Sequence, residues 1–361
     1  MTADDRSAPV QRPPAWDVAW EAAWQARSGD PALVPVRVVR IDKGGITTAS
    51  SPNDERLVVA AKAVRRVVVG DVCALDAQTG RIEEILDRRT VFERRAPGAE
   101  RVDVTVEAKA LAANMDVVLV LQAVDSGVNT SRLARELVLA WDSGARPVVV
   151  LTKADMIGAA ELEDERRAAQ RYAPQVPVVC VSVVATGGTE DLDAHLTAGT
   201  VAVLLGASGA GKSTLANSLA GRDVQLTAEV REGDQRGRHT TTAGQMLELT
   251  EDRWLIDTPG IRGVGLWHSD EGLERAFADL SPFAQRCRFA DCTHGGEPGC
   301  GIQIAIDAGE LDADRLATWH SLVAEVERLE AEAEVAEREE KRDRNQRSRR
   351  RAAAQRGKPR R

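Results

Sequence analysis

Apolar runs alternate with amphipathic segments through the middle of the chain. Each run is apolar at nearly every position, which is typical of strands buried on both faces of a parallel sheet. The segments 131–144 and 161–173 have helical spacing, and Gly144 marks a helix end. The apolar runs are 117–124, 147–151, 176–181, 201–205 and 253–256. This alternation predicts a parallel α/β sheet with helices on both faces, and ligands at the carboxyl ends of its strands.

The pattern changes before this region. Residues 33–95 contain about five short β-like runs separated by Gly, Asp and Asn turns, which suits a small barrel of the oligonucleotide/oligosaccharide-binding (OB) type. Upstream, Trp16, Trp20 and Trp24 share one face of a short helix, which we expect to pack on the neighbouring domain. The predicted domains are an N-terminal extension 1–32, a five-stranded barrel 33–97, an α/β nucleotide-binding domain 98–265, a metal-binding module 266–320, and a charged helix with a basic tail 321–361.

A glycine-rich stretch follows the apolar run 201–205. Gly206, Gly211, Lys212 and Ser213 form the pattern G-x-x-x-x-G-K-S between a predicted strand and a predicted helix. Glycines let backbone N–H groups wrap phosphates, and the helix adds the positive end of its dipole. Lys212 is placed to reach the β- and γ-phosphates, and Ser213 to offer a hydroxyl to Mg²⁺. This is a phosphate-binding loop.

Two polar segments that end other strands suggest which base is bound. Thr152, Lys153, Ala154 and Asp155 follow one apolar run, and Ser182 ends the next. A carboxylate at Asp155 would accept the two hydrogen bonds that guanine N1 and N2 offer and adenine does not. The stem of Lys153 can lie over the base, and the Ser182 loop can support it from the other side. Asp155 therefore argues against a phosphate-loop ATPase or kinase.

Further candidates follow the phosphate loop. Asp257 ends a strand, where its carboxylate can hold Mg²⁺ through water, and Gly260 has an N–H that can sense a γ-phosphate. The threonine-rich loop 237–244 is placed to be a switch, and Thr241 is our candidate for completing the Mg²⁺ shell. Ordinary small GTPases have the base-reading motifs last, whereas here they come first. A circularly permuted chain builds the same sheet.

Three of the chain's five cysteines cluster with a histidine. Cys287, Cys292, His294 and Cys300 offer three thiolates and one imidazole, a set that suits closed tetrahedral Zn²⁺. Four N/S ligands leave no open position, so we expect one structural zinc ion. The intervening glycines and proline supply the turns that such a loop needs.

Charge is distributed unevenly along the 361 residues. Residues 341–361 hold 11 Lys/Arg and one Asp, a net charge of +10, although the whole chain has a net charge of −8. A basic tail on an acidic body suggests a polyanionic partner. The chain contains no run of 18 apolar residues and no apolar N-terminal signal region, so we expect a cytoplasmic protein with no membrane partner.

The order of these motifs, with a barrel before them and a cysteine cluster after them, resembles the circularly permuted ribosome small-subunit-dependent GTPase A family. The resemblance covers residues 33–320 and rests on segments 112–125, 151–155, 206–219, 237–242, 257–261 and 287–300. It implies a monomeric cytoplasmic GTPase that binds one zinc and uses Mg²⁺ with GTP. It further implies stimulation by the small ribosomal subunit, contact with its rRNA, and action late in its maturation.

The resemblance also implies residue roles. The GTP-binding candidates are Thr152, Lys153, Ala154, Asp155, Ser182, Gly206, Ala207, Ser208, Gly209, Ala210, Gly211, Lys212, Ser213, Thr214, Asp257 and Gly260. The catalytic candidates are Lys212, Thr241 and His239. His239 is the candidate for orienting water because Ile261 stands where many GTPases have a water-orienting glutamine, and Arg238 is the alternative, which could stabilise transition-state charge instead. Thr152 replaces the usual asparagine, so we expect weaker base affinity with GTP preference kept through Asp155. The alternative function is a GTP-gated rRNA-binding factor whose hydrolysis is incidental.

Overall fold

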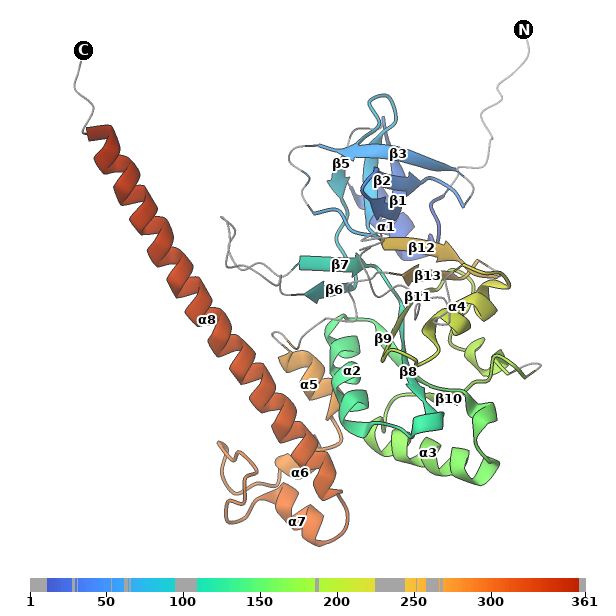
Figure 1. The fold of residues 1–361 in the computed structure, drawn as a ribbon, viewed down its shortest axis with the longest axis vertical. Coiled ribbons are helices and arrows are strands. Elements are labelled where there is room, and N and C mark those ends of the chain that lie inside the picture. Colours follow the sequence, from blue (N-terminus) through green and yellow to red (C-terminus); the bar gives the residue numbers. More distant parts are fainter. Residues whose placement is uncertain are drawn as a thin grey trace, which may run out of the picture.

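A computed structural model of the chain describes residues 12–27, 30, 32–52, 54–61, 64, 66–94, 109–185, 188–224, 244–250, 252–257, 266 and 269–356. Figure 1 shows a β-rich region from the N-terminal third joined to a central α/β region, with short helices beyond it. The last helix runs away from this body as a single long rod.

The central α/β region is built on parallel strands covered by helices. Its strands are β8 (Val117–Ala123), β9 (Arg146–Thr152), β10 (Val178–Cys180), β11 (Val201–Gly206) and β13 (Trp254–Asp257), with β12 (Gly244–Glu248) antiparallel to β13. The spatial order is β10-β9-β8-β11-β13-β12. The helices are α2 (Thr130–Asp142), α3 (Ala159–Tyr172) and α4 (Lys212–Ala220), and the 3₁₀ turns are η1 (Val124–Ser126), η2 (Ala154–Met156) and η3 (Glu190–Leu192).

Strand β8 shows why the sheet is covered on both faces. Val118 and Val120 enter the core that includes α2 residues, whereas Leu119 and Leu121 enter the opposite core with α4 residues. Successive side chains of a strand point to opposite faces, so a strand apolar at every position needs a core on each side. This is the two-sided α/β sheet that the sequence predicts.

The N-terminal strands pair in a cycle. They are β1 (Leu33–Asp42), β2 (Gly45–Ala49), β3 (Glu55–Ala60), β4 (Val72–Asp76) and β5 (Arg81–Ile85). Their order is β1-β2-β3-β5-β4, and β1 also pairs with β4. They are not separate from the central sheet, because β1 also pairs with β12 at Arg40 and Ile41. A register shift between Val38 and Arg40 marks the change of partner, and one large mixed sheet results.

The N-terminal extension packs on this region through α1 (Val18–Ala26). Asp17 caps the helix by accepting a hydrogen bond from the Trp20 N–H at 2.7 Å. Trp20 is buried against Val72 and Leu86, with Trp16 and Trp24 partly buried beside it, as the tryptophan spacing predicts. The extension is also held by a buried arginine, Arg37, which donates to the carbonyls of Pro14 and Ala15 (both 3.1 Å).

A two-stranded sheet crosses the boundary predicted between residues 97 and 98. Strand β6 (Val91–Arg94) pairs antiparallel with β7 (Lys109–Ala113). Residues 95–108 lie outside the described part of the chain, so that boundary stays a prediction.

Short helices and one long helix form the C-terminal part. They are α5 (Asp270–Ala276), α6 (Ser281–Ala284), α7 (Gly301–Asp307) and α8 (Ala313–Arg356). Helix α2 holds this part in place, because Asp142 accepts a hydrogen bond from the Gly272 N–H at 2.7 Å. A Cβ at Gly272 would lie 2.2 Å from the Asp142 carboxylate, so only glycine allows this approach. Arg135 also pairs with Glu325 of α8 at 2.7 Å.

Among the described residues, no helix combines the length and the apolar character that crossing a bilayer requires.

Candidate functional site

The phosphate loop has the backbone conformation that its glycines predict. Gly206, Gly209 and Gly211 have φ values of 148°, 80° and 82°, a region that favours glycine. At Gly206 a Cβ would lie only 2.7 Å from the Leu121 carbonyl oxygen of the adjacent strand β8. Helix α4 begins at Lys212, directly after the loop. The loop therefore joins β11 to α4 and passes close to β8. This arrangement presents N–H groups to phosphates.

Lys212 is buried within this loop. Its ammonium donates to the carbonyl oxygen of Gly206 at 2.7 Å and also to that of Ala207. A buried ammonium needs polar partners, and here the loop's own carbonyls supply them. The same loop geometry brings Ser213 to the first turn of α4 as a half-buried side chain.

Thr152 joins the base-reading segment to the phosphate loop. It ends β9, is buried, and its hydroxyl donates to the Ala210 carbonyl oxygen at 3.0 Å. The Cβ that an alanine at Gly211 would add lies 3.7 Å from Thr152, so the two segments are in close contact. A threonine hydroxyl has one hydrogen, and the nearer of its two carbonyl acceptors is Ala210 of the phosphate loop, with Gln122 of β8 at 3.4 Å. The position therefore braces the loop even without asparagine.

The remaining residues of the base-reading segment lie on a tight turn. Lys153 has a left-handed φ of 61°, and its ammonium contacts Asp125 at 2.6 Å. Asp155 lies on η2 with an exposed side chain that accepts no hydrogen bond from the described part of the chain. The Ala154 N–H donates to the Val181 carbonyl oxygen at 3.1 Å, which links this turn to the Ser182 loop.

Ser182 forms two local hydrogen bonds after β10. Its N–H donates to the Gly188 carbonyl oxygen at 2.9 Å, and its hydroxyl accepts from the Ala185 N–H at 3.2 Å. Because β10, β9, β8 and β11 are neighbouring parallel strands, the predicted segments at 152–155, 182 and 206–214 meet at one edge of the sheet. Asp257 ends the next strand, β13, which pairs with β11 from Val201 to Val203.

A buried polar pair beneath this edge was not foreseen from the sequence. The Gln122 amide donates to the Glu136 carboxylate at 2.8 Å, and both residues are buried. Burial raises the pKa of Glu136 to about 7, against the opposing effects of nearby Arg132, Lys212 and Gln122. The available signal was a single glutamine in an otherwise apolar strand.

Other predicted residues lie outside the described part of the chain. They are His239, Thr241 and Gly260. Their roles stay predictions.

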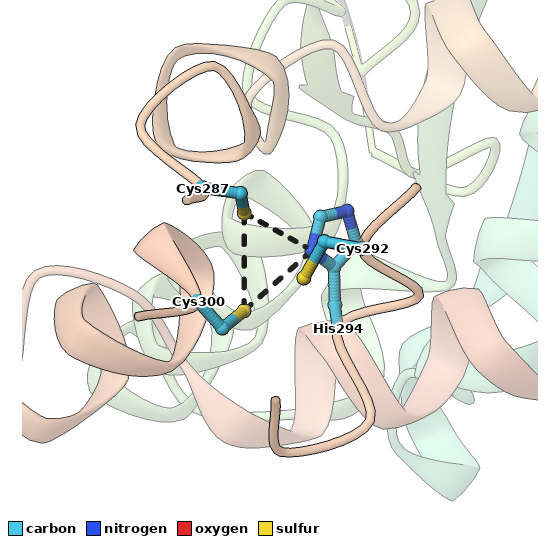
Figure 2. A group of neighbouring side chains, drawn as sticks. All are labelled: Cys287, Cys292, His294 and Cys300. Atoms are coloured by element: carbon cyan, nitrogen blue, oxygen red, sulfur yellow. Dashed lines mark hydrogen bonds between the residues drawn. The ribbon is translucent and has the colours of Figure 1, made fainter. Parts of the chain in front are cut away.

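The four predicted metal ligands lie together in the C-terminal part. Figure 2 shows Cys287, Cys292, His294 and Cys300 facing one another, and their ligand atoms all lie within 4.8 Å of each other. The Cys287 and Cys300 sulfurs are 4.0 Å apart, and they lie 3.5 and 3.6 Å from His294 Nδ1. Donor atoms around a tetrahedral zinc ion are about 3.5–3.8 Å apart. The donor set and its spacing therefore fit a metal ion.

Two glycines let the ligand-bearing segments approach. The Arg288 N–H donates to the Gly299 carbonyl oxygen at 3.0 Å, and the Gly301 N–H lies 3.2 Å from the Cys287 sulfur. A Cβ at Gly301 would lie 2.2 Å from the Phe283 carbonyl oxygen. N–H donors to sulfur favour the thiolate form, which is the form that binds metal.

Comparison with known proteins agrees with a GTPase site in the α/β region. A model of the RsgA GTPase family matches residues 85–267. A small ribosomal subunit biogenesis GTPase RsgA from Streptomyces avermitilis is 38% identical over 335 residues, which are 91% of this chain and 89% of that protein. The protein of the same name from Streptomyces coelicolor is 39% identical over 315 residues, covering 85% of this chain and 84% of that protein.

Two solved structures share the fold. YjeQ from Thermotoga maritima has a TM-score of 0.61 and 24% identity, covering 81% of this chain and 99% of that one. YloQ, described as a circularly permuted GTPase, has a TM-score of 0.59 and 20% identity, covering 83% and 97%. The α/β region therefore has the circularly permuted GTPase fold.

Proposed function

This chain belongs to the RsgA GTPase family, and we propose that it hydrolyses GTP on the small ribosomal subunit during a late step of that subunit's maturation. The observation that carries the nucleotide part of the proposal is the hydrogen bond from Thr152 to Ala210, which joins the base-reading turn to the phosphate loop in one site. The small-subunit part is supported by the relatives, which are named small ribosomal subunit biogenesis GTPases.

Each part of that site has an assigned role in our proposal. Asp155 accepts guanine N1 and N2, while Lys153, held by Asp125, covers the base and Ser182 supports it. The loop 206–214 wraps the phosphates. Lys212 exchanges its two carbonyl partners for phosphate oxygens, which stabilises the charge that develops during transfer to water.

Magnesium and the attacking water complete the proposed chemistry. Ser213 and Asp257 offer oxygen donors of the kind Mg²⁺ prefers, and the bound ion would neutralise phosphate charge. Thr241 would add a hydroxyl, and the Gly260 N–H would face the γ-phosphate. His239 would orient the attacking water when the small subunit is bound. We therefore expect slow hydrolysis by the protein alone and stimulation by the subunit.

The rest of the chain serves subunit contact in this proposal. We assign β1–β5 as an OB-type barrel, supported by the cyclic pairing that returns β4 to β1. We assign zinc to the cysteine–histidine cluster because three thiolates and one imidazole suit it. Together with the basic tail 341–361, these parts contact rRNA, and the protein acts as a cytoplasmic monomer. The domain divisions at 32, 97, 265 and 320 are part of the same proposal.

One exposed aromatic side chain supports an RNA contact by the metal-binding module. Phe289 lies between ligands Cys287 and Cys292 and is 45% exposed. The Arg288 guanidinium lies 5.4 Å from the Phe289 ring centroid. A cation beside an exposed ring is suited to a phosphate and a stacked base.

The test measures GTP hydrolysis with and without purified small subunits, at two salt concentrations, with ATP as the control nucleotide. We expect strong stimulation that is specific for GTP and weakens with salt, because rRNA contact is largely electrostatic. Tight GTP binding without any stimulation would overturn the proposal and leave GTP as a ligand that only holds a conformation.

A further inference from the structure

A groove lies between the short helices of the C-terminal part and helix α8. Its volume is about 540 Å³. Its floor is apolar and is formed from α5, the turn that follows it, α7 and α8. The apolar lining residues include Leu273, Phe277, Leu280 and Ile302, which are at most 6% exposed, and the half-buried Trp319 and Val323. His294 lines one end, so the groove adjoins the cysteine–histidine cluster.

Helix α8 presents a continuous stripe to this groove. Trp319, Val323, Val326 and Glu330 follow one another at helical spacing and all line it. Trp319 is held in place by the His294 ring, with centroids 5.7 Å apart. Helix α8 therefore forms one side of the groove, and the candidate metal ligand His294 lies at one end of it.

The rim of the groove is acidic. It carries four carboxylates, Asp270 and Glu274 from α5 and Glu327 and Glu330 from α8, and the described lining includes no lysine or arginine. Within the described part of the chain, Asp270, Glu274 and Glu327 form no ion pair. Residues 321–340 of α8 carry eight glutamates and two arginines, so the surrounding field is also negative.

We propose that this groove binds a basic amphipathic segment of a protein partner, with apolar side chains on the floor and lysine or arginine side chains at the rim. The inference rests on the proposed function, since such a segment would belong to a protein of the small ribosomal subunit. Burial of apolar side chains in an apolar groove is favourable, and the carboxylates at its rim attract cationic side chains. RNA is disfavoured, because its phosphates would face four carboxylates.

The first test uses a defined probe and needs no subunit. A fluorescein-labelled 16-residue helical peptide with leucines on one face and lysines on the other is titrated with the full-length, zinc-loaded protein. A peptide with glutamate in place of lysine is the matched control. We expect saturable binding of the lysine peptide only, weakened at least about fivefold by the double variant Glu274→Lys/Glu327→Lys.

A second double variant controls for net charge. Glu161→Lys/Glu310→Lys changes two exposed glutamates outside the groove and raises the net charge by the same amount. It should bind the lysine peptide as the unmodified protein does, apart from a small general loss. Equal weakening by both double variants, or no binding by the unmodified protein, would overturn the groove assignment.

The second test identifies the partner on purified small subunits. A benzophenone amino acid replaces Val323 on the floor or Glu327 on the rim, with Ile304 (an exposed apolar residue of α7) as the control position. Zinc content and limited proteolysis over 270–310 check the folding of the module. We expect a crosslink that survives ribonuclease, is destroyed by protease, and maps to a basic segment. A crosslink only to RNA, or one no stronger than at Ile304, contradicts the proposal.

Charge reversal at the rim distinguishes a protein partner from RNA by the direction in which binding changes. Glu274→Lys/Glu327→Lys should weaken binding to whole subunits but leave binding to deproteinised rRNA unchanged or tighter. Tighter binding to both would show that RNA occupies the groove and would overturn the proposal. If the unmodified protein binds the peptide but not the subunit, the proposed function fails while the chemistry of the groove stands.

Discussion

The nucleotide site and the metal-binding module of this protein are held together in different ways. Nucleotide-site residues lie at the ends of neighbouring strands that are buried on both faces, so the sheet itself fixes their spacing. The module has helices of only four and seven residues, α6 and α7, near its ligands. Helices this short are marginal by themselves. The comparison indicates that neighbouring strands fix the spacing of the first site. The second rests on short helices and the candidate metal ligands, with Leu280 and Ile302 joining it to the main core.

The largest expected effect is loss of the metal. If the cluster holds zinc as proposed, Cys300→Ser or removal of the ion by a chelator should destabilise the module, because a bound metal would contribute to its folding free energy, on the order of 10 kcal/mol in small zinc domains. Basal GTP hydrolysis should change less than about twofold. Metal content, limited proteolysis over 270–310 and subunit pelleting measure this. Unchanged proteolysis without metal would show that the module has a sufficient core of its own.

Lys212→Ala should produce the converse result. Losing the phosphate-loop ammonium should lower GTP hydrolysis at least about 100-fold, because positioned charge supplies most of phosphoryl-transfer catalysis. Zinc content and proteolysis of the module should stay as in the unmodified protein. Steady-state hydrolysis at saturating GTP, with metal analysis of the same sample, checks both. A variant that hydrolyses GTP normally would remove Lys212 from the catalytic machinery.

The buried pair beneath the nucleotide site predicts a pH dependence of stability. Burial raises the pKa of Glu136 from 4.5 to about 7, so between these values the folded state keeps a proton that the unfolded state has lost. The contribution of Glu136 to the free energy of unfolding is complete below pH 4.5 and is lost as the pH rises through about 7. Glu136→Gln should remove this fall in the free energy of unfolding, which amounts to up to about 3 kcal/mol.

Urea denaturation of the nucleotide-free protein from pH 5 to 8 measures that difference. Glu161→Gln, which changes an exposed glutamate of α3, is the matched control and should keep the slope of the unmodified protein. Parallel curves for Glu136→Gln and the unmodified protein would show that Glu136 ionises normally.

The smallest effect concerns the brace between the two nucleotide segments. Thr152→Val keeps the side-chain shape but removes the donor to Ala210, which should cost about 1 kcal/mol, or roughly fivefold in GTP affinity. Thr152→Ser should keep the bond and Thr152→Asn should raise affinity, with ATP still excluded by Asp155. Titration with fluorescent GDP and GTP distinguishes these variants. Equal affinities for Val and Ser would show that the hydroxyl does not brace the loop.

Features that depend on local spacing were predictable from the amino-acid sequence. Glycines 206 and 211 with Lys212 predict the phosphate loop because its conformation needs residues without a Cβ. The ligands from Cys287 to Cys300 predict a metal site because they lie within 14 residues. Uniformly apolar runs predict strands with a core on both faces, since side chains alternate along a strand.

Features that depend on register between distant segments could not be predicted from local patterns. Nothing local to β1 predicts that its second half pairs with β12, nor that Gln122 meets Glu136 across 14 positions. The acidic groove likewise exists only because α5 and α8, far apart in the chain, lie side by side. Local periodicity fixes which side of an element is buried. The partner that covers that side is chosen by the packing of the whole chain.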